Sequence, residues 1–329
     1  MNTFSWLLLL SFFLLPFQFA LSPKEGFDLA VIRLVSPLLV LGWLLCGLLR
    51  RRIILPDILT TFFLTGFLVI TSLSVFWSEN RDFALRKEFF LLSFLPLLIV
   101  LSSVFEERKE FLPLLLKSFV YGAFLSACSG IAFFLSQFLF GVEKVFAFLT
   151  GSILPFFLGT AFAQSVAEHP SLLVNISGAT ILRASGVFPD PHMFAFYLGM
   201  ASPIALAFTL LASSQKKKKI WSLVFVTILF ADLLSFSRGG YVGLLAGGIF
   251  FLFASGALSY WSRRQKMGVF FLIPFLVTAI FLSPFGTRFL SSFSHTDGSN
   301  VERLRLWEEA VIHIGERPFF GVGLGNYPL

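Results

Sequence analysis

Long apolar stretches, separated by short polar connections, dominate this chain. A helix needs about 20 consecutive apolar residues to cross a bilayer, and each stretch approaches that length. Nine of them lie at residues 4–21, 29–49, 57–77, 89–105, 113–140, 192–212, 220–236, 241–261 and 267–283. The pattern therefore predicts an all-α polytopic membrane protein with about nine transmembrane helices.

Basic residues gather in alternate connections between these stretches, at Arg50–Arg52, Arg108–Lys109, Lys216–Lys219 and Arg263–Lys266. Because cytoplasmic loops carry an excess of Lys and Arg, all four connections are expected in the cytoplasm, together with the amino terminus. No basic region precedes the first stretch and no small-residue cleavage site follows Ala20. We therefore expect a retained helix there rather than a signal peptide.

Two longer segments fall on the predicted outer side. Residues 145–166 are apolar enough for a tenth crossing, but that crossing would move Lys216–Lys219 outside. We therefore expect 141–191 to be an outer loop with a re-entrant or interfacial helix, broken near Gly151 and Pro155. These predictions give two domains, a transmembrane bundle over 1–283 and the beginning of an outer loop over 284–329.

Composition agrees with this pattern. Hydrophobic residues make up 57% of the chain and charged residues only 13%, which excludes an ordinary soluble globule. The net charge of +7 is spread over the loop clusters rather than one face, so no nucleic-acid partner is expected. Cys46 and Cys128 both lie in apolar stretches, and neither a disulfide framework nor a metal site is predicted.

Polar residues near the outer end of the seventh stretch are the first candidates for chemistry. Asp232 lies inside the stretch, where an ionisable group is costly, and a buried contact with Arg238 is one possibility. Gly239, Gly243 and Gly247 follow at intervals of four, which is typical of close helix packing. Packing does not explain Arg238, whose guanidinium suits either a phosphate or a lipid headgroup.

A second polar segment, residues 183–192, leads into the sixth stretch. Asp190 and Pro191 suit a helix cap and first turn. Arg183 supplies a cation, and either Asp190 or His192 could accept a proton.

The third segment begins at Ser299. An apolar stripe of Leu304, Trp307, Val311 and Ile314 predicts an amphipathic helix that lies on the bundle and ends before Pro318. The glycines that follow, Gly321, Gly323 and Gly325, predict a flexible turn. No strand precedes this G-x-G-x-G run, so a dinucleotide-binding fold is excluded.

These three segments, in this order and on the same side, resemble the O-antigen ligase/polymerase superfamily of bacterial envelope glycosyltransferases. Residues 183–192 are similar to its R-x-x-G-x-F-x-D-P-N motif, with His192 where Asn is usual, and Ser237-Arg238-Gly239 resembles its S-R-G turn. Two further segments are similar to the start of the family's large periplasmic loop. They are Arg303-x-x-x-Trp307-x-x-Ala310 and Pro318-x-x-Gly321-x-Gly323-x-Gly325-Asn326-Tyr327. The resemblance covers roughly residues 60–329.

The resemblance implies an enzyme of lipopolysaccharide biosynthesis in the bacterial inner membrane. It would transfer a glycan from undecaprenyl pyrophosphate to lipid A-core or another acceptor at the periplasmic face, without a cofactor, nucleotide or metal. Arg238 and Arg303 would be catalytic cations, and the substrate-binding residues would be Arg183, Asp190, Asp232 and Arg305. The family also includes repeat-unit polymerases and protein O-oligosaccharyltransferases, which the residues do not separate from ligases.

One feature of the family is not matched. Its members continue to a catalytic His in an H-N-x-Y-L-like segment and to further membrane helices, whereas this sequence stops at Leu329. His295 and His313 lie outside such a motif. The resemblance thus implies a C-terminally truncated member, and two alternatives stay open, a non-catalytic polyprenyl-lipid binder or transporter and an inactive remnant.

Overall fold

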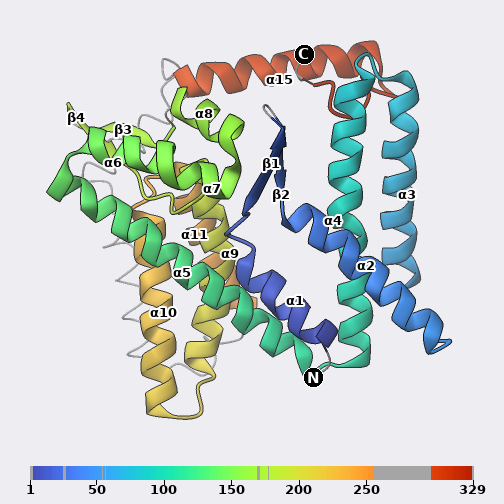
Figure 1. The fold of residues 1–329 in the computed structure, drawn as a ribbon, viewed down its shortest axis with the longest axis horizontal. Coiled ribbons are helices and arrows are strands. Elements are labelled where there is room, and N and C mark those ends of the chain that lie inside the picture. Colours follow the sequence, from blue (N-terminus) through green and yellow to red (C-terminus); the bar gives the residue numbers. More distant parts are fainter. Residues whose placement is uncertain are drawn as a thin grey trace. The chain divides into compact units, whose positions relative to one another are not determined.

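The computed structural model is predominantly helical (Figure 1) and describes residues 3–24, 27–53, 55, 57–168, 171–176, 178–254 and 298–327. Five of its helices are long and apolar enough to cross a membrane: Ile32–Leu49, Ile58–Trp77, Arg81–Glu107, Phe111–Phe140 and Pro191–Leu210. The predicted fold class, an all-α polytopic membrane protein, is confirmed. The helix predicted at 267–283 lies outside the described residues.

The elements follow one another along the chain as α1 (Thr3–Leu14), β1 (Ala20–Lys24), β2 (Phe27–Ala30), α2 (Ile32–Leu49), α3 (Ile58–Ser74), η1 (Val75–Trp77), α4 (Arg81–Glu107) and α5 (Phe111–Phe140). Then come α6 (Val142–Phe148), η2 (Leu149–Ile153), α7 (Leu154–Leu158), α8 (Thr160–Glu168), β3 (Leu173–Ile176), β4 (Ala179–Leu182), α9 (Pro191–Leu210), α10 (Gln215–Leu233), α11 (Arg238–Ala254) and α15 (Gly298–Glu316). Each strand pair, β1–β2 and β3–β4, forms a small antiparallel hairpin.

The continuous helix predicted over residues 4–21 is wrong in its second half. α1 ends at Leu14, two residues before Pro16, and the chain then turns into the β1–β2 hairpin. Proline has no N–H to continue the helical bonding, and Phe17 N instead donates to Leu14 O at 2.8 Å. Phe19 follows with a φ of 38°, which is not helical. The remaining 12-residue helix is about 18 Å long.

The chain divides into two compact units. The first contains Met1–Leu8, Val31–Leu115 and Ser294–Leu329. In it, α4 packs against both α2 and α3. Two side-chain bonds join these helices, from Trp43 Nε1 to Ser103 Oγ at 3.0 Å and from Ser72 Oγ to Glu88 Oε1 at 2.6 Å.

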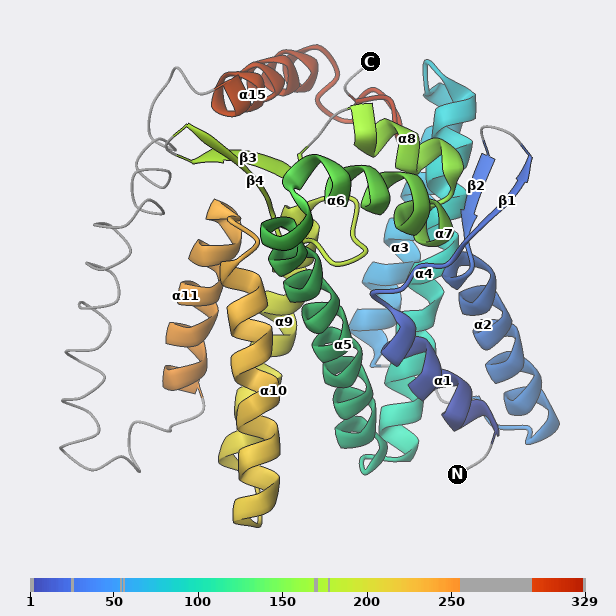
Figure 2. The same cartoon turned by 60° about the vertical axis from the view of Figure 1, so that its left-hand side comes forward.

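The second unit contains Leu9–Ala30 and Leu116–Phe293. Its core lies among α5, α9 and α10, with α9 and α10 side by side (Figure 2). Aromatic rings fill much of this core, including Phe194, which is fully buried, and Trp221, which stacks on Phe208 at a centroid distance of 4.7 Å. The first turn of α9 is thereby fixed against its neighbours, and that turn carries the candidate site.

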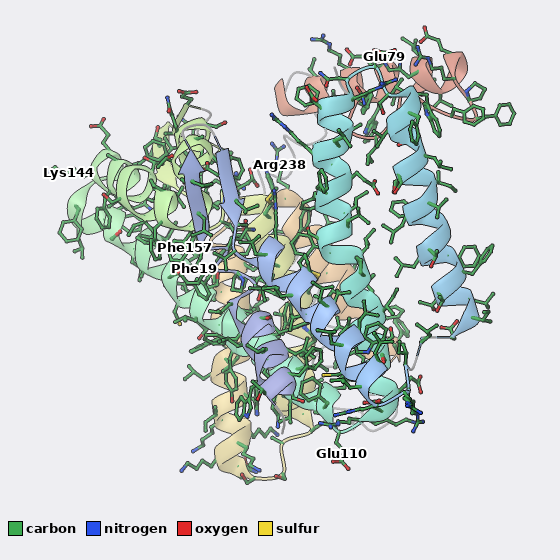
Figure 3. The ribbon with its side chains drawn as sticks, turned by 45° about the vertical axis from the view of Figure 1, so that its right-hand side comes forward. Phe19, Glu79, Glu110, Lys144, Phe157 and Arg238 are labelled. Atoms are coloured by element: carbon green, nitrogen blue, oxygen red, sulfur yellow. The ribbon has the colours of Figure 1, made fainter. Side chains whose placement is uncertain are left out.

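Residues 141–191 form short helices followed by the β3–β4 hairpin. The α-helix is interrupted near the predicted break, since α6 ends at Phe148, Gly151 lies within the π-helical turn η2 and Pro155 lies in the first turn of α7. A second break, which the sequence did not predict, follows at Gly159, whose φ is 91°. Phe157 of α7 lies beside Phe19, with ring centroids 5.2 Å apart (Figure 3).

Candidate functional site

A buried arginine holds the turn between α10 and α11, residues 234–237. Arg183 follows β4 and is only 4% exposed. Its Nε donates to Ser235 O at 2.7 Å, its Nη2 to Phe236 O at 3.2 Å and its Nη1 to Ser171 O at 3.0 Å. Phe236 has a φ of 51°, a conformation that costs a non-glycine residue about 1–2 kcal/mol. The guanidinium therefore stabilises a strained turn.

The placement of Arg183 bears on its predicted role in substrate binding. Its guanidinium donates to main-chain oxygens on two segments, so in this structure Arg183 positions the turn that precedes Arg238. Contact with a substrate stays a prediction. Asp190 caps α9 as its sequence suggests, with Oδ1 accepting from His192 N at 2.5 Å.

His192 and Ser237 join the beginnings of α9 and α11. The imidazole Nδ1 of His192 lies 2.7 Å from Ser237 Oγ. Ser237 is fully buried, and its Oγ also accepts from Gly240 N at 3.1 Å, which is an N-cap contact. Sequence reasoning gave Ser237 no role, although a serine directly before a helix is a capping signal that could have identified it.

Arg238 is the first residue of α11 and is half-buried (Figure 3). A helix amino terminus has unpaired N–H groups and the positive end of the helix dipole. Together with the guanidinium, they favour an anion such as a phosphate at this position. His192 contacts Ser237, and Ser237 directly precedes Arg238, the predicted catalytic cation.

The close packing of α11 on α9 depends on Gly240. A Cβ atom there would lie 2.7 Å from Ala195 Cβ. Of the stripe predicted from sequence, Gly239 lies near Phe196, but no described atom is within 4 Å of a Cβ built at Gly243 or Gly247. Within the described residues, Gly243 and Gly247 thus do not form a packing surface.

Asp232 is fully buried in α10, and no described residue donates a hydrogen bond to either of its carboxyl oxygens. The sequence left a contact with Arg238 open, and no hydrogen bond joins these two side chains. The carboxyl group faces small residues instead, since a Cβ built at Gly240 would lie 3.2 Å from Oδ1 and one at Gly199 would lie 3.9 Å from Oδ2. A buried carboxyl without a partner is costly, and this cost makes Asp232 a candidate functional group.

Gly199 also lines an apolar groove of about 100 Å³ among α9, α10 and α11. Phe225 and Leu229 of α10 and Leu244 of α11 form part of its wall. The groove and Asp232 therefore share one glycine as a boundary. Among the described side chains, no cluster of three His, Cys, Asp or Glu is arranged to hold a metal ion.

The remaining predicted residues lie on α15, in the other compact unit. Arg305 Nε donates to Glu309 Oε1 at 3.0 Å, and its side chain is 69% exposed. Arg303 belongs to the same helix, but its side chain lies outside the described residues. The predicted apolar stripe of α15 is exposed, with Trp307 67% and Val311 68% accessible.

The segment after α15 docks on the turn between α3 and α4. Arg317 forms an ion pair with Glu79 (Figure 3) at 2.9 Å. Asn326 Oδ1 accepts a hydrogen bond from Asn80 N at 2.7 Å. Trp77 Nε1 donates to Phe320 O at 2.8 Å. The flexible turn predicted at the three glycines is therefore an ordered segment, in which all three have positive φ values.

Comparison with known families addresses the resemblance directly. Residues 223–329 match the family described as O-antigen ligase. This match, over the carboxyl-terminal third of the sequence, supports the resemblance to the O-antigen ligase superfamily. No curated protein and no solved structure matches it significantly.

The matched range includes Asp232 and Arg238 of the second unit and Arg303 and Arg305 of α15. It begins after Arg183, Asp190 and His192, whose relation to the superfamily rests on the motif resemblance alone. The family match and the apolar helices together support a membrane protein similar to glycosyltransferases of the O-antigen ligase/polymerase type.

Proposed function

We propose that this protein transfers a glycan from undecaprenyl pyrophosphate to lipid A-core or another acceptor, at the periplasmic face of the bacterial inner membrane. The observation that carries the proposal is the position of Arg238 at the amino terminus of α11, within the range that matches the O-antigen ligase family. The N–H groups of this helix end and the guanidinium would together bind the carrier's pyrophosphate.

The chemistry requires cations at this place. When the acceptor hydroxyl attacks the anomeric carbon, the bond from that carbon to the pyrophosphate oxygen breaks, and negative charge grows on the leaving group. A fixed guanidinium stabilises that charge more in the transition state than in the ground state, which is how binding energy accelerates a reaction. The superfamily resemblance assigns a second cation to Arg303, and assigns binding of the glycan to Arg305 and Asp190.

The groove among α9, α10 and α11 suits the lipid part of the carrier. It is apolar, and Gly199 connects it to the surroundings of Asp232. We place part of the polyprenyl chain there and assign Asp232 to the head of that groove, close to the pyrophosphate. Arg183 would contribute indirectly, by holding in place the turn that precedes Arg238.

The test is a transfer assay with the purified full chain, undecaprenyl-pyrophosphate glycan and lipid A-core, with the product measured by mass spectrometry. Removing one cation at a developing charge typically costs about 10²–10³-fold in rate, so Arg238→Ala should lose that much turnover. Arg303→Ala should lose turnover as well. Lys144→Ala, which removes an exposed cation of α6 in the same unit as Arg238, should retain it.

Other outcomes would identify the alternatives. Carrier binding that depends on Arg238 without any product would support a lipid binder or transporter. Extension of the carrier-linked glycan would support a polymerase, and a glycosylated peptide acceptor would support a protein O-oligosaccharyltransferase. Equal turnover in Arg238→Ala and in the wild type would contradict the proposed site.

A further inference from the structure

We infer that a pocket at the ends of α2 and α4 binds the phosphate group of an anionic phospholipid. The pocket belongs to the first compact unit and lies on the side of the membrane that the sequence predicts to be cytoplasmic. Figure 3 labels Glu110 just beyond this end of α4 and Glu79 just before the opposite end. None of the residues assigned to glycan transfer lines the pocket, so the inference is independent of that function.

Three arginines line this pocket. Arg50 and Arg52 follow α2, and Arg108 follows α4. Among the described residues, no side chain forms an ion pair or a hydrogen bond with any of these three guanidinium groups. Their N–H donors are therefore available to a ligand, and arginine N–H groups match the oxygens of a phosphate in pairs.

The charges that line the pocket leave it positive. Glu107 also lines it, and the carboxyl ends of α2 and α4 each add about half a negative charge from the helix dipole. These contributions offset about two of the three arginine charges, so about one positive charge is left over. A phosphodiester carries a single negative charge, which would balance it.

The turn after α2 brings two of the arginines to the same pocket. Arg52 N donates to Gly47 O at 2.9 Å and Arg51 N donates to Leu48 O at 3.0 Å, which ends the helix in a Schellman motif. Glycine is usual at the position of Arg51, whose φ of 51° is strained for a residue with a side chain. A basic cluster that only sets membrane orientation needs its charges but not this turn, which places Arg50 and Arg52 at one ligand.

The size and lining of the pocket suit the head of a lipid. Its volume is about 50 Å³. One water molecule needs about 10–15 Å³, so the pocket has room for about four, which is the size of a phosphate with its oxygens. Phe4, Trp43 and Val104 complete the lining with apolar surface. Trp43 lies about 10 Å before Arg50 along the axis of α2, so a lipid would place its phosphate at the arginines and its first acyl carbons along Trp43.

The thiol of Cys46 provides a local measurement of binding. Cys46 is exposed and lines the pocket, whereas Cys128, the other cysteine of the chain, lies in the second unit. The full chain in neutral detergent is titrated with phosphatidylglycerol, and labelling of both thiols by N-ethylmaleimide is followed by peptide mass spectrometry. Labelling of Cys46 should slow as the lipid binds, and labelling of Cys128 should not change.

Charge selectivity is tested on the wild type. Phosphatidylcholine with the same acyl chains has no net charge and should need at least about tenfold higher concentration for equal protection, since hydrogen bonds to charged groups are the stronger ones. Inorganic phosphate and glycerol 3-phosphate test whether a free anion suffices, and they should protect Cys46 only at much higher concentration than the lipid. These comparisons require no variant.

Variants then test the pocket itself. Arg52→Ala and Arg108→Ala should each need about tenfold more phosphatidylglycerol, because each removes charged donors from the ligand. Arg51→Ala is the matched control, since it removes the same charge from the same run of arginines but its side chain does not line the pocket. Its protection curve should stay within about twofold of the wild type, as an exposed charge contributes little. A thermal melt of each variant shows whether it has kept its fold.

Several results would contradict the inference. Equal protection by phosphatidylglycerol and phosphatidylcholine, or no protection by either, would overturn it outright. Protection by free phosphate at the concentration at which the lipid acts would replace the lipid with a soluble anion. An equal loss in Arg51→Ala and Arg52→Ala would mean general attraction to the basic cluster rather than binding in the pocket. Glycan transfer is measured separately through Arg238→Ala, so none of these results decides the proposed function.

Discussion

At the scale of single residues, small differences in contact decide which candidates can act. Arg183 and Arg238 are both arginines of the predicted site, yet Arg183 is 4% exposed and bound to main-chain oxygens, whereas Arg238 is half-buried at a helix end. The same holds for glycines. Gly240 and Gly243 belong to one helix, but only Gly240 has a described neighbour where a Cβ would be placed.

Gly240→Ala should therefore separate α11 from α9. The new methyl carbon would lie 2.7 Å from Ala195 Cβ, which is closer than two carbons can approach, so the helices must shift. Overpacking of this kind costs about 1–3 kcal/mol, and we expect a lower melting temperature in detergent and reduced turnover. Gly243→Ala is the control and should stabilise the helix by up to about 1 kcal/mol. Similar melting of both variants would contradict the packing.

At the scale of elements, one carboxylate connects the β1–β2 hairpin to α8. Asp28 Oδ1 accepts from Ser22 Oγ at 2.7 Å, and its Oδ2 accepts from Phe162 N, in the first turn of α8, at 2.9 Å. The two elements are separated by 134 residues along the chain. Desolvation opposes ionisation of this carboxyl, but the bonds from Ser22 and from the start of α8 outweigh it and lower the pKa of Asp28 below 3.8.

This contact should be sensitive to acid. Because the folded pKa lies below the unfolded one, the stabilisation is complete above pH 3.8 and is lost as the pH falls through the lowered pKa. Asp28→Asn should weaken the α8 cap by about 1 kcal/mol at neutral pH and remove this dependence. Hydrogen exchange at the Phe162 amide is the measurement. Equal protection in both proteins down to pH 3 would contradict the contact.

At the scale of the whole molecule, segments far apart in sequence complete one another. The turn between α3 and α4 receives the segment after α15, and Asn80 and Asn326, which make one of these contacts, are 246 residues apart. Figure 1 shows α15 running crosswise to α3 and α4, at the end that carries this turn. The position of α15 within its unit therefore depends on residues of the turn between α3 and α4, far from it in sequence.

Gly323→Ala should release this segment. Gly323 has a φ of 89°, and a Cβ there would lie 2.1 Å from Ser78 Oγ and 2.7 Å from Ser78 Cα. The backbone strain alone costs about 1–2 kcal/mol, so hydrogen exchange over 317–327 should accelerate at least about fivefold. Gly315→Ala, in α15 with no described atom within 4 Å of its Cβ, is the matched control and should not accelerate it. An unchanged exchange rate in Gly323→Ala would mean that the segment is held elsewhere.

Hydrophobicity, prolines and capping residues determined most of the fold locally. They predicted the apolar helices, the α9 start at Asp190-Pro191 and the end of α15 before Pro318, because each of these depends on a few consecutive residues. Three polar motifs led to the O-antigen ligase resemblance, which the match over residues 223–329 supports. The end of α1 was equally local, since Pro16 stops that helix, but the long apolar stretch hid it.

Only the tertiary structure decided which polar groups meet. His192 and Ser237 are 45 residues apart, Arg183 and Ser235 are 52 apart, and the glycines after α15 reach a turn about 250 positions earlier. No periodicity links such positions, because periodicity reports which face of an element is apolar and not which element covers it. The roles of Arg183, and of the Ser237 hydroxyl that contacts both a helix N–H and an imidazole, depend on which elements pack against each other.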